Sequence, residues 1–288
     1  NNIELQNKID VCLNAKKNDF IEVNENGTYL NIRFSYIDTE WISGVIMTID
    51  DVTSLMNLEN NKKEFFQNAS HELKSPLTCI IGYQQMITEG ILDTKEQILD
   101  SANKSLKEAI RMNDILSDML SLATIEARQT SLKENINPKA IIEDVVITLS
   151  IEAKKNNIKI STDLDDNTLF ASRTEFNEVV RNLIDNAIKY NKENGTIFVS
   201  YKDGILIVKD TGIGIKDEDK SRIFERFYRV DKARSKKTGG TGLGLAIVKH
   251  ICLNNNYKLD LDSRLGLGTT FKLSLIHISE PTRRVVIS

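Results

Sequence analysis

The chain has 288 residues, of which 40% are hydrophobic and 27% charged, and its formal net charge is −3. This length is enough for two domains and part of a third, and the composition is that of an ordinary globular protein. The slightly acidic balance excludes a typical nucleic-acid-binding protein, which presents a strongly basic face. The three cysteines, Cys12, Cys79 and Cys252, lie far apart. They predict neither a disulfide framework nor a metal site, and they favour a reducing compartment such as the cytoplasm.

No signal peptide and no run of about 18 apolar residues occurs in the sequence, so no segment of it is expected to cross a membrane. The first residue is not Met, and we therefore expect a piece of a longer protein. Membrane contact is expected only through a region upstream of the sequence, which would anchor the full-length protein in the plasma membrane.

The beginning of the chain predicts β-strands. Ile32, Phe34 and Tyr36 alternate with polar residues, which is the period of a half-buried strand. The segment IDTE, residues 37–40, is expected to form the turn to a second strand. Because so few strands bury little core by themselves, we interpret residues 1–53 as the end of a larger domain.

Two long helical segments follow, at about 54–89 and 94–128. Apolar residues recur in each with the spacing of a helix, so each segment presents one apolar side. The break between them, EGILDT, predicts an antiparallel helical hairpin. A lone hairpin leaves much of both apolar sides exposed, and we expect two copies to associate into a four-helix bundle.

Strands and helices alternate from residue 131 onward. Pro138 opens one helix, a position where proline is tolerated. Ser172 and Glu175 have the spacing of a capping box at the start of another. Asp203-Gly204 predicts a hairpin turn between two strands. These elements predict an α+β domain over residues 131–276.

His71 lies on the first long helix, on the side away from its apolar residues. The simplest interpretation is a surface histidine without a role. However, Glu72 is adjacent, and Ser75 lies one turn further along the same face. Pro76 removes a backbone hydrogen bond and is expected to bend the helix. Glu72 has the chemistry to fix the tautomer of His71 and make the other ring nitrogen a better nucleophile.

A later helix carries Asn182, Asn186 and Lys189 together on one face, beside its apolar stripe. A solvated polar face is the simpler interpretation of this pattern. The asparagine oxygens, however, are hard ligands that suit Mg²⁺, and the lysine supplies positive charge for phosphates. This face is therefore a second candidate site.

Two glycine-rich segments follow, DTGIGI at 210–215 and GGTGLGL at 239–245. The second is the stronger signal, because glycines let backbone N–H groups approach an anion at the start of a helix. Residues 223–238, between them, combine aromatic and basic side chains, and we expect a mobile lid over a nucleotide. The Walker pattern and the dinucleotide fingerprint do not occur, which excludes a P-loop NTPase and a Rossmann enzyme.

In this order and spacing, the motifs resemble those of the sensor histidine kinases of two-component systems. HELKSPLT at 71–78 resembles the phosphoacceptor box, NLIDNAIKY at 182–190 the N box, and IFERFYRVD at 223–231 the F box. DTGIGI and GTGLGL resemble the first two glycine boxes, and GLGTTF at 266–271 the last. The resemblance covers residues 54 to about 275.

This resemblance implies a multidomain α+β chain. Residues 54–130 would form a dimerising helical hairpin that carries the phosphoacceptor histidine, and residues 131–276 an ATP-binding α/β sandwich of the Bergerat type. Residues 1–53 resemble the C-terminal end of a PAS-like sensor domain. Residues 277–288 have no counterpart in the family and are expected to be a non-native or disordered tail.

The activity implied by the resemblance is phosphorylation of His71 by ATP, with Glu72 as its acid/base partner. The phosphoryl group would then pass to an aspartate of a response regulator receiver domain. Ser75 stands where the family usually has Thr or Asn, a residue that orients water when the kinase dephosphorylates its regulator. Since serine keeps the hydroxyl, phosphatase activity remains open.

The implied nucleotide site takes ATP and Mg²⁺. Asn186 would ligate the metal, Asp210 would accept the adenine amino proton, and Arg229 would approach the γ-phosphate, where positive charge stabilises the transferring group. The other residues that the resemblance places around the nucleotide are Asn182, Lys189, Tyr190, Gly212, Gly214, Tyr228, Gly240, Gly242, Leu243, Gly244 and Thr269.

The segment 251–263 lacks the His-Gly-Gly turn usual in the family, so Asn254–Asn256 would have to form this turn, and asparagine tolerates the left-handed backbone that it needs.

Three rival functions predict other residues or another organisation of the chain. A Bergerat-fold ATPase or chaperone would carry a water-activating glutamate at the position of Asn182. An inactive nucleotide-binding scaffold would have lost nucleotide-contacting residues, and a serine/threonine kinase of this fold would lack the hairpin.

Overall fold

The computed structural model describes residues 2–127, 131–230 and 240–275. The chain divides into two compact units, Asn1–Ser70 and His71–Ser288. The boundary between them falls within helix α2, Thr53–Thr88. Among the described residues, no helix is both long and apolar enough to cross a membrane.

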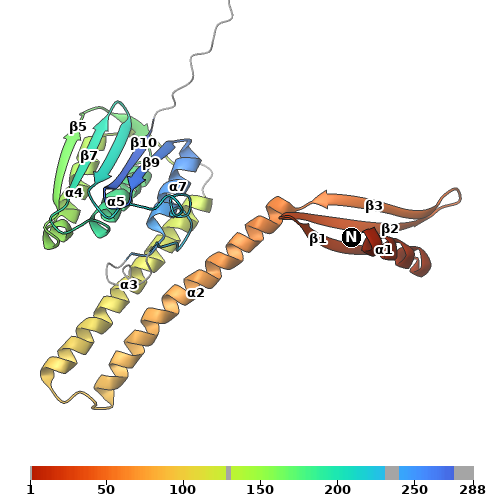
Figure 1. Cartoon of the computed structure of the whole chain (residues 1–288), viewed down its shortest axis with the longest axis horizontal. Helices are drawn as coiled ribbons and strands as arrows, with labels where there is room; N and C mark the ends of the chain where they lie inside the picture. The colour runs from red at the N-terminus through yellow and green to blue at the C-terminus, as the bar shows by residue number, and fades with distance from the viewer. Residues whose placement is uncertain (1, 128–130, 231–239, 276–288) are drawn as a thin grey trace, which may run out of the picture. The chain divides into compact units, whose positions relative to one another are not determined.

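The first unit contains a three-stranded antiparallel sheet and a helix. Strands β1 (Asp19–Glu25), β2 (Thr28–Asp38) and β3 (Ser43–Asp51) follow one another in the sheet, and helix α1 (Asn2–Ala15) packs against it (Figure 1). Ile32 and Phe34 are buried beneath Cys12 of α1, which confirms the alternation predicted for β2. Helix α1 was not predicted, although Leu5, Ile9 and Cys12 have helical spacing.

The turn between β2 and β3 lies two residues later than the predicted segment 37–40. The backbone N–H of Thr39 donates to the carbonyl of Ile42 over 2.9 Å, and the hydroxyl of Thr39 accepts from the Ile42 N–H over 3.1 Å. Strand pairing continues to Asp38, which moves the turn outward. Trp41, within this turn, is 88% exposed.

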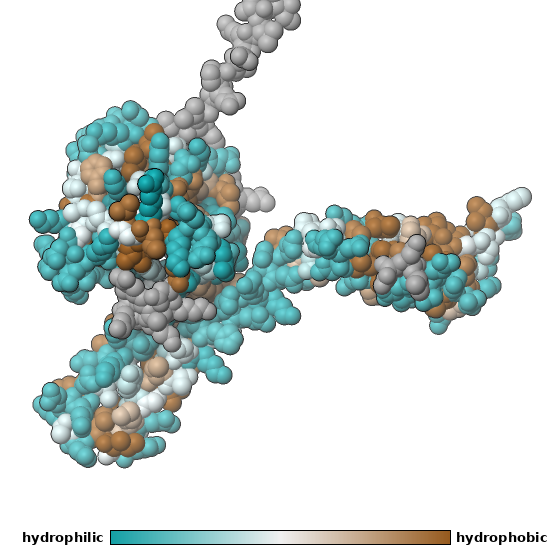
Figure 2. All heavy atoms as spheres, viewed as in Figure 1, coloured by the Kyte–Doolittle hydropathy of each residue, from teal (hydrophilic) through white to brown (hydrophobic). Residues whose placement is uncertain are grey.

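In the second unit, the remainder of α2 and helix α3 (Lys95–Ala127) form the expected hairpin (Figure 1). Helix α2 continues through Pro76, which is buried. Gln84 Nε2 donates to Ser105 Oγ between the two helices, over 3.2 Å. Many apolar side chains of the hairpin are nevertheless exposed, and Figure 2 shows some of them near the end that joins the helices.

The rest of the second unit is a mixed sheet with helices packed against it. The helices are α4 (Pro138–Lys155), α5 (Arg173–Lys189) and α7 (Gly244–Asn255). The sheet has the order β5-β7-β8-β10-β9, with β5 (Lys159–Leu164), β7 (Thr196–Lys202), β8 (Ile205–Asp210), β9 (Lys258–Arg264) and β10 (Gly268–Ser274). The pair β5 and β7 is parallel and the others are antiparallel, while β4 (Glu134–Ile136) and β6 (Leu169–Ala171) form a small separate sheet.

The strands β8 and β10 alternate between buried and more exposed side chains. Val208 and Phe271 are buried, whereas Lys209 is exposed. Since side chains two residues apart lie on the same face of a strand, Asp210 and Thr269 are placed on the buried face with them. The pattern of the strands thus carries two polar groups into the interior at one end of the sheet.

The start of α5 follows the predicted cap only in part. Ser172 Oγ accepts from the backbone N–H of Glu175 over 3.5 Å, which is one half of a capping box. The carboxylate of Glu175 does not complete the box. Its Oε2 accepts instead from Ser131 Oγ (3.0 Å) and Asn255 Nδ2 (2.8 Å), so Glu175 ties α5 to two other segments.

The end of α7 confirms the turn expected of the asparagine run. Asn256 is the C-cap and has a left-handed backbone, with φ of 54°. Its N–H donates to the carbonyl of Leu253, and Tyr257 N–H donates to that of Cys252 over 2.9 Å. Asparagine therefore ends this helix where glycine is more usual.

Candidate active site

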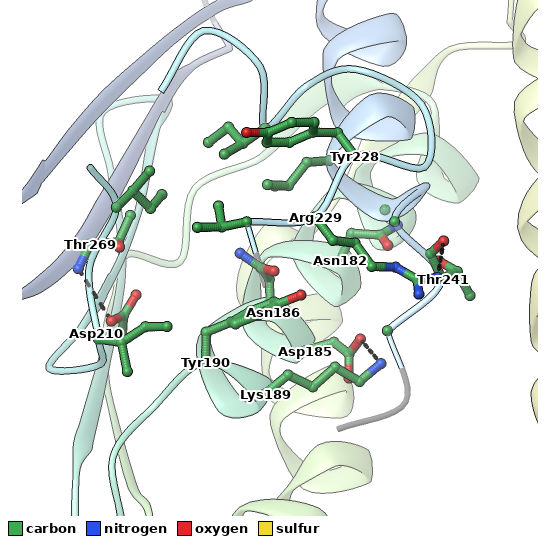
Figure 3. A pocket seen from close by; sticks show the side chains of 18 of the residues that line it. Asn182, Asp185, Asn186, Lys189, Tyr190, Asp210, Tyr228, Arg229, Thr241 and Thr269 are labelled. Atoms are coloured by element: carbon green, nitrogen blue, oxygen red, sulfur yellow. Dashed lines mark hydrogen bonds and ion pairs between the residues drawn. The ribbon is translucent and has the colours of Figure 1, made fainter. Parts of the chain in front are cut away.

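A pocket of about 670 Å³ opens in the second unit, lined by α3, α5, the segment after β8 and the start of α7 (Figure 3). This volume lies within the range of small-molecule sites. Most residues that the sequence analysis assigned to a nucleotide line it, namely Asn182, Asn186, Lys189, Tyr190, Asp210, Gly214, Tyr228, Arg229, Gly240, Gly242, Gly244 and Thr269. The fold thus brings motifs that are far apart in the sequence to one cavity.

Gly212 and Leu243 were predicted to contact the nucleotide but do not line the pocket. Gly212 N–H donates to Asp210 Oδ1 over 2.7 Å, and a Cβ at Gly212 would lie only 2.3 Å from the carbonyl oxygen of Tyr190. Leu243 is fully buried in the core, and its N–H donates to Thr241 Oγ1 over 3.2 Å. Both residues therefore support residues of the pocket wall without lining the cavity themselves.

Asp210 forms one wall of the pocket, at the end of β8. Its Oδ1 accepts from the backbone N–H groups of Gly212 (2.7 Å) and Thr269 (3.2 Å). Burial raises the pKa of the Asp210 carboxyl, and the two backbone donors oppose that shift. Among the described residues no group donates to Oδ2, which leaves this oxygen for a donor that enters the pocket.

Helix α5 contributes a polar face to the pocket, as predicted. Figure 3 shows Asn182, Asn186 and Lys189 on this face, which follows from their spacing. Lys189 Nζ pairs with Asp185 Oδ2 at 2.7 Å. Burial alone would lower the pKa of Lys189, but the nearby carboxylates, Asp185 first, raise it above its usual value. The lysine is therefore a stable cation in the wall.

Residues 240–245, the described part of the second glycine-rich segment, are the glycine segment and form a further wall of the pocket. Gly242 has φ of 78° and accepts the N–H of Phe227 at its carbonyl over 2.9 Å. Gly244 and Leu245 also line the pocket, and α7 begins there, so the first free N–H groups of the helix lie at this wall. A Cβ at Gly244 would come within 2.5 Å of Asn182 Oδ1. Such a wall suits an anion.

Tyr228 lies above the pocket in the view of Figure 3. Its hydroxyl donates to Asp219 Oδ1 over 2.5 Å, and the guanidinium of Arg222 stacks on its ring at 4.3 Å. The hydrogen bond to Asp219 is the main cause of the raised pKa of Tyr228. The predicted lid, 223–238, is described only as far as residue 230, and the remainder lies outside the described residues.

The hairpin supplies the other predicted catalytic residues. His71 and Ser75 are exposed on α2. Glu72 Oε2 accepts from Arg229 Nη2 over 3.0 Å and lies 3.5 Å from Arg111 Nη2. Arg229 also donates to the Thr241 carbonyl over 2.8 Å. Within the described part of the chain no hydrogen bond joins Glu72 to His71, so the expected polarisation of His71 is not made in this arrangement.

The sequence analysis missed two carboxylates of α3, Asp114 and Asp118, which line the pocket. Asp118 Oδ2 accepts from the hydroxyl of Thr241 over 2.6 Å. Burial raises the pKa of Asp118, and the bond from Thr241 opposes that shift. Their spacing of four residues places both on one helix face, but no local signal shows that this face meets the glycine segment.

Comparison with known proteins bears on both parts of the site. Residues 61–128 match the family model of the His Kinase A (phospho-acceptor) domain. Residues 171–278 match that of the histidine kinase-, DNA gyrase B- and HSP90-like ATPase. The sensor protein SrrB of Staphylococcus aureus (strain N315) is 32% identical over 290 residues, covering 94% of this chain and 48% of SrrB. The chain thus spans about half the length of the curated relatives it matches.

Solved structures show the same likeness. The histidine kinase AdeS of Acinetobacter baumannii is 26% identical with a TM-score of 0.57, covering 71% of this chain and 98% of AdeS. The histidine kinase ThkA, solved in complex with the response regulator protein TrrA, is 26% identical with a TM-score of 0.56. That likeness covers 94% of this chain and 82% of ThkA.

The helical hairpin and the pocket therefore define a phosphoacceptor domain followed by an ATP-binding domain of the histidine kinase type. The phosphoacceptor match, 61–128, precedes the ATPase match, 171–278, along this chain. The chain belongs to the sensor histidine kinases.

Proposed function

We propose that this chain uses ATP to phosphorylate its own His71 and passes the phosphoryl group to an aspartate of a response regulator receiver domain. The observation that carries the proposal is the convergence of Asn186, Lys189, Asp210 and the glycine segment on one pocket, in the unit whose hairpin exposes His71. A hydrolytic ATPase of the same fold is less well supported, because Asn182 has no basic group with which to activate water.

The proposed step is a phosphoryl transfer. An imidazole nitrogen of His71 attacks the γ-phosphorus, the N–P bond forms, the bond to the bridging oxygen breaks, and ADP leaves. The imidazole proton passes to Glu72, which is paired with Arg229 in this structure and loses its charge on protonation. Arg229 is then available to stabilise negative charge on the transferring group. Ser75, one turn from His71, is proposed to orient water when the regulator is dephosphorylated.

The walls of the pocket suit adenine at one end and phosphates at the other. Asp210 Oδ2 is open to the pocket and suits the adenine amino group, whereas guanine presents a carbonyl at that position. Asn186 offers a hard oxygen and is proposed to ligate Mg²⁺. When bound, Mg²⁺ would neutralise phosphate charge. Asn182, Lys189 and Tyr190 are proposed to lie around the phosphates.

The proposed domain organisation is a PAS-like end at 1–53, the hairpin at 54–130 and the ATP-binding domain at 131–276. The tail predicted at 277–288 lies outside the described residues. The hairpin is proposed to form a homodimer, and the exposed apolar side chains along α3 support this. Free cysteines support a cytoplasmic location for this portion, with any membrane anchor upstream.

The decisive experiment is labelling with ATP that carries a radioactive γ-phosphate. The wild type should take up an acid-labile label, as a phosphohistidine does, and the His71→Gln variant should not. His277→Gln is the matched control, because His277 belongs to the tail 277–288, which has no counterpart in the family. Equal acid-labile labelling of the His71→Gln variant would refute the proposal.

The same assay decides which subunit of a dimer phosphorylates which. A His71→Gln chain keeps its nucleotide pocket, and an Asn186→Asp chain keeps its phosphoacceptor. Each should be inactive by itself. If the mixture labels the Asn186→Asp chain, phosphorylation occurs between subunits, and if the mixture stays unlabelled, it occurs within one.

A further inference from the structure

The hairpin places a carboxylate at the phosphate end of the pocket. Asp118 of α3 lines the cavity together with Asn182, Lys189 and Gly244. We propose that Asp118 is an autoinhibitory group, which holds the glycine segment through Thr241 and opposes the entry of nucleotide phosphates. This inference rests on the proposed binding of ATP in the same pocket.

Thr241 is the point at which Asp118 acts on the glycine segment. Its hydroxyl donates to Asp118 Oδ2 over 2.6 Å and accepts from the Leu243 N–H over 3.2 Å. Its carbonyl accepts from Arg229 Nη2 over 2.8 Å. Because Leu243 is the N-cap of α7, the Asp118 contact fixes the segment that leads into the helix whose N-terminus is proposed to receive the phosphates.

The charge around Asp118 leaves little to offset a further anion. Lys189, a nearby cation of the pocket, is already paired with Asp185 at 2.7 Å. Arg181 also favours the ionised Asp118, but Glu178 disfavours it, and the burial of Asp118 is the largest influence on its pKa and raises it. Negative charge at this position is therefore already costly. A di- or triphosphate close to Asp118 would add to that cost.

A second carboxylate of the hairpin acts on the same region. Glu72 Oε2 holds Arg229 at 3.0 Å, and the Arg229 side chain is only 5% exposed. The two hairpin carboxylates thus engage Thr241 and Arg229, which flank the phosphate end of the pocket and contact each other. Nucleotide binding and this docked arrangement compete for the same groups.

Competition of this kind is reciprocal. If Asp118 weakens nucleotide binding, a bound nucleotide must weaken the hold of α3 on Thr241 by the same factor. The C-terminal end of α3 combines two buried apolar residues, Leu122 and Ile125, with polar contacts. Asn254 Nδ2 donates to the Ile125 carbonyl over 2.9 Å, and His250 Nε2 lies 3.2 Å from Glu126 Oε1. Hydrogen bonds of this type exchange for water at little net cost.

The test is calorimetric binding of ADP and of adenosine to the wild type, Asp118→Asn and Asp118→Ala in the presence of Mg²⁺. Asp118→Asn keeps a hydrogen-bond acceptor for Thr241 and removes the charge, whereas Asp118→Ala removes both. We expect both variants to bind ADP about fivefold or more tightly than the wild type, the lower end of usual coupling strengths. Asp118→Asn should leave adenosine affinity unchanged, because adenosine carries no phosphate.

Asp100→Asn is the matched control, since Asp100 is an exposed carboxylate of α3 that pairs with Lys104. It should leave ADP affinity unchanged. If ADP affinity is unchanged or weaker in both Asp118 variants, the autoinhibitory role is overturned, and a weaker value would instead indicate a metal ligand. If no protein, including the wild type, binds ADP, the proposed function itself fails.

A second measurement tests the contact between Asp118 and Thr241 in the absence of nucleotide. Hydrogen exchange of backbone amides in 115–122 and 241–245 should be faster in Asp118→Ala than in the wild type. Circular dichroism checks that the variant is folded. Unchanged exchange in both segments would show that Asp118 does not hold the glycine segment and would overturn the proposal by a route independent of ADP.

Discussion

At the level of single residues, Asp210 joins a buried strand end to the open pocket. One of its oxygens is held by the N–H groups of Gly212 and Thr269, and the other is left for a ligand. Asp210→Asn would present an amide there and leave a hydrogen bond to adenine unmade, which costs about 1–3 kcal/mol. We expect ATP affinity to fall roughly 10- to 100-fold, and the preference for ATP over GTP to shrink.

Calorimetric titration with ATP and GTP measures both effects. Asp163→Asn is the control, because Asp163 is a half-exposed carboxylate on β5 that pairs with Lys202. It should leave both affinities as in the wild type. An Asp210→Asn variant that kept the preference for ATP would contradict the assigned role.

The raised pKa of Asp210 predicts a pH dependence of stability. Burial raises this pKa above the ordinary 3.8, so the folded protein binds the proton more tightly than the unfolded chain does. The stabilisation from this group is therefore fully present below the unfolded pKa and is lost as pH rises through the folded pKa. The difference in unfolding free energy between wild type and Asp210→Asn, measured by urea denaturation, should change across that window. A constant difference would refute the shift.

Residues of the site were predictable where the motif and the contact lie in one short segment. Asn182, Asn186 and Lys189 share a helix face, which their spacing in the sequence is enough to predict. Asp118 was missed because its partner, Thr241, is more than a hundred positions away and no pattern in α3 shows the contact. Leu243 was also assigned to the nucleotide; in the structure its side chain is fully buried and is not among the pocket residues.

At the level of elements, the left-handed cap of α7 yields a stability prediction. Asn256 has φ of 54°, where a residue with a Cβ and no local hydrogen-bonding side chain costs roughly 1–2 kcal/mol. Asn256→Ala should destabilise the ATP-binding part by about 1 kcal/mol, whereas Asn256→Gly should be neutral or stabilising.

Urea denaturation followed by circular dichroism measures this pair. Asn167→Ala is the control, since Asn167 is exposed and its φ is not positive. That change should be close to neutral. Equal stability of the Asn256→Ala and Asn256→Gly variants would show that the backbone angle is not what constrains this position.

Elements with a long and regular pattern were predicted, and short or weakly patterned ones were not. Helices α2 and α3 begin and end within a residue or so of the prediction. Helix α1 carries its apolar residues at helical spacing but among many polar ones, so the strands after it dominated the interpretation. The capping box failed in its second half because tertiary partners at Ser131 and Asn255 took the Glu175 carboxylate.

At the level of the whole molecule, the apolar side of α3 predicts association. Leu106 is 59% exposed and Ile110 is 54% exposed, and the two lie one turn apart on the same face of α3. Contiguous exposed apolar side chains of this kind mark an interaction surface. Leu106→Glu or Ile110→Glu would bury an unpaired charge in the proposed dimer, which costs about 3–5 kcal/mol. We expect the dimer dissociation constant to rise roughly a hundredfold or more.

Sedimentation equilibrium measures the dissociation constant. Lys104→Gln changes the net charge by the same amount on the opposite side of α3 and breaks only an exposed pair with Asp100. It should leave the dimer intact. If all three variants associate like the wild type, the dimer does not use this side of the hairpin.

The turn between β2 and β3 carries the tryptophan on which the intrinsic fluorescence of this protein depends. Trp41 is the chain's one tryptophan, and it projects into solvent from the first unit. Trp41 is not among the residues that line the pocket of the second unit, so no tryptophan lies in the wall that nucleotide is proposed to contact. Direct contact between nucleotide and a pocket tryptophan therefore gives no signal in a fluorescence titration of the unmodified chain. An extrinsic fluorophore on the nucleotide itself supplies the missing signal.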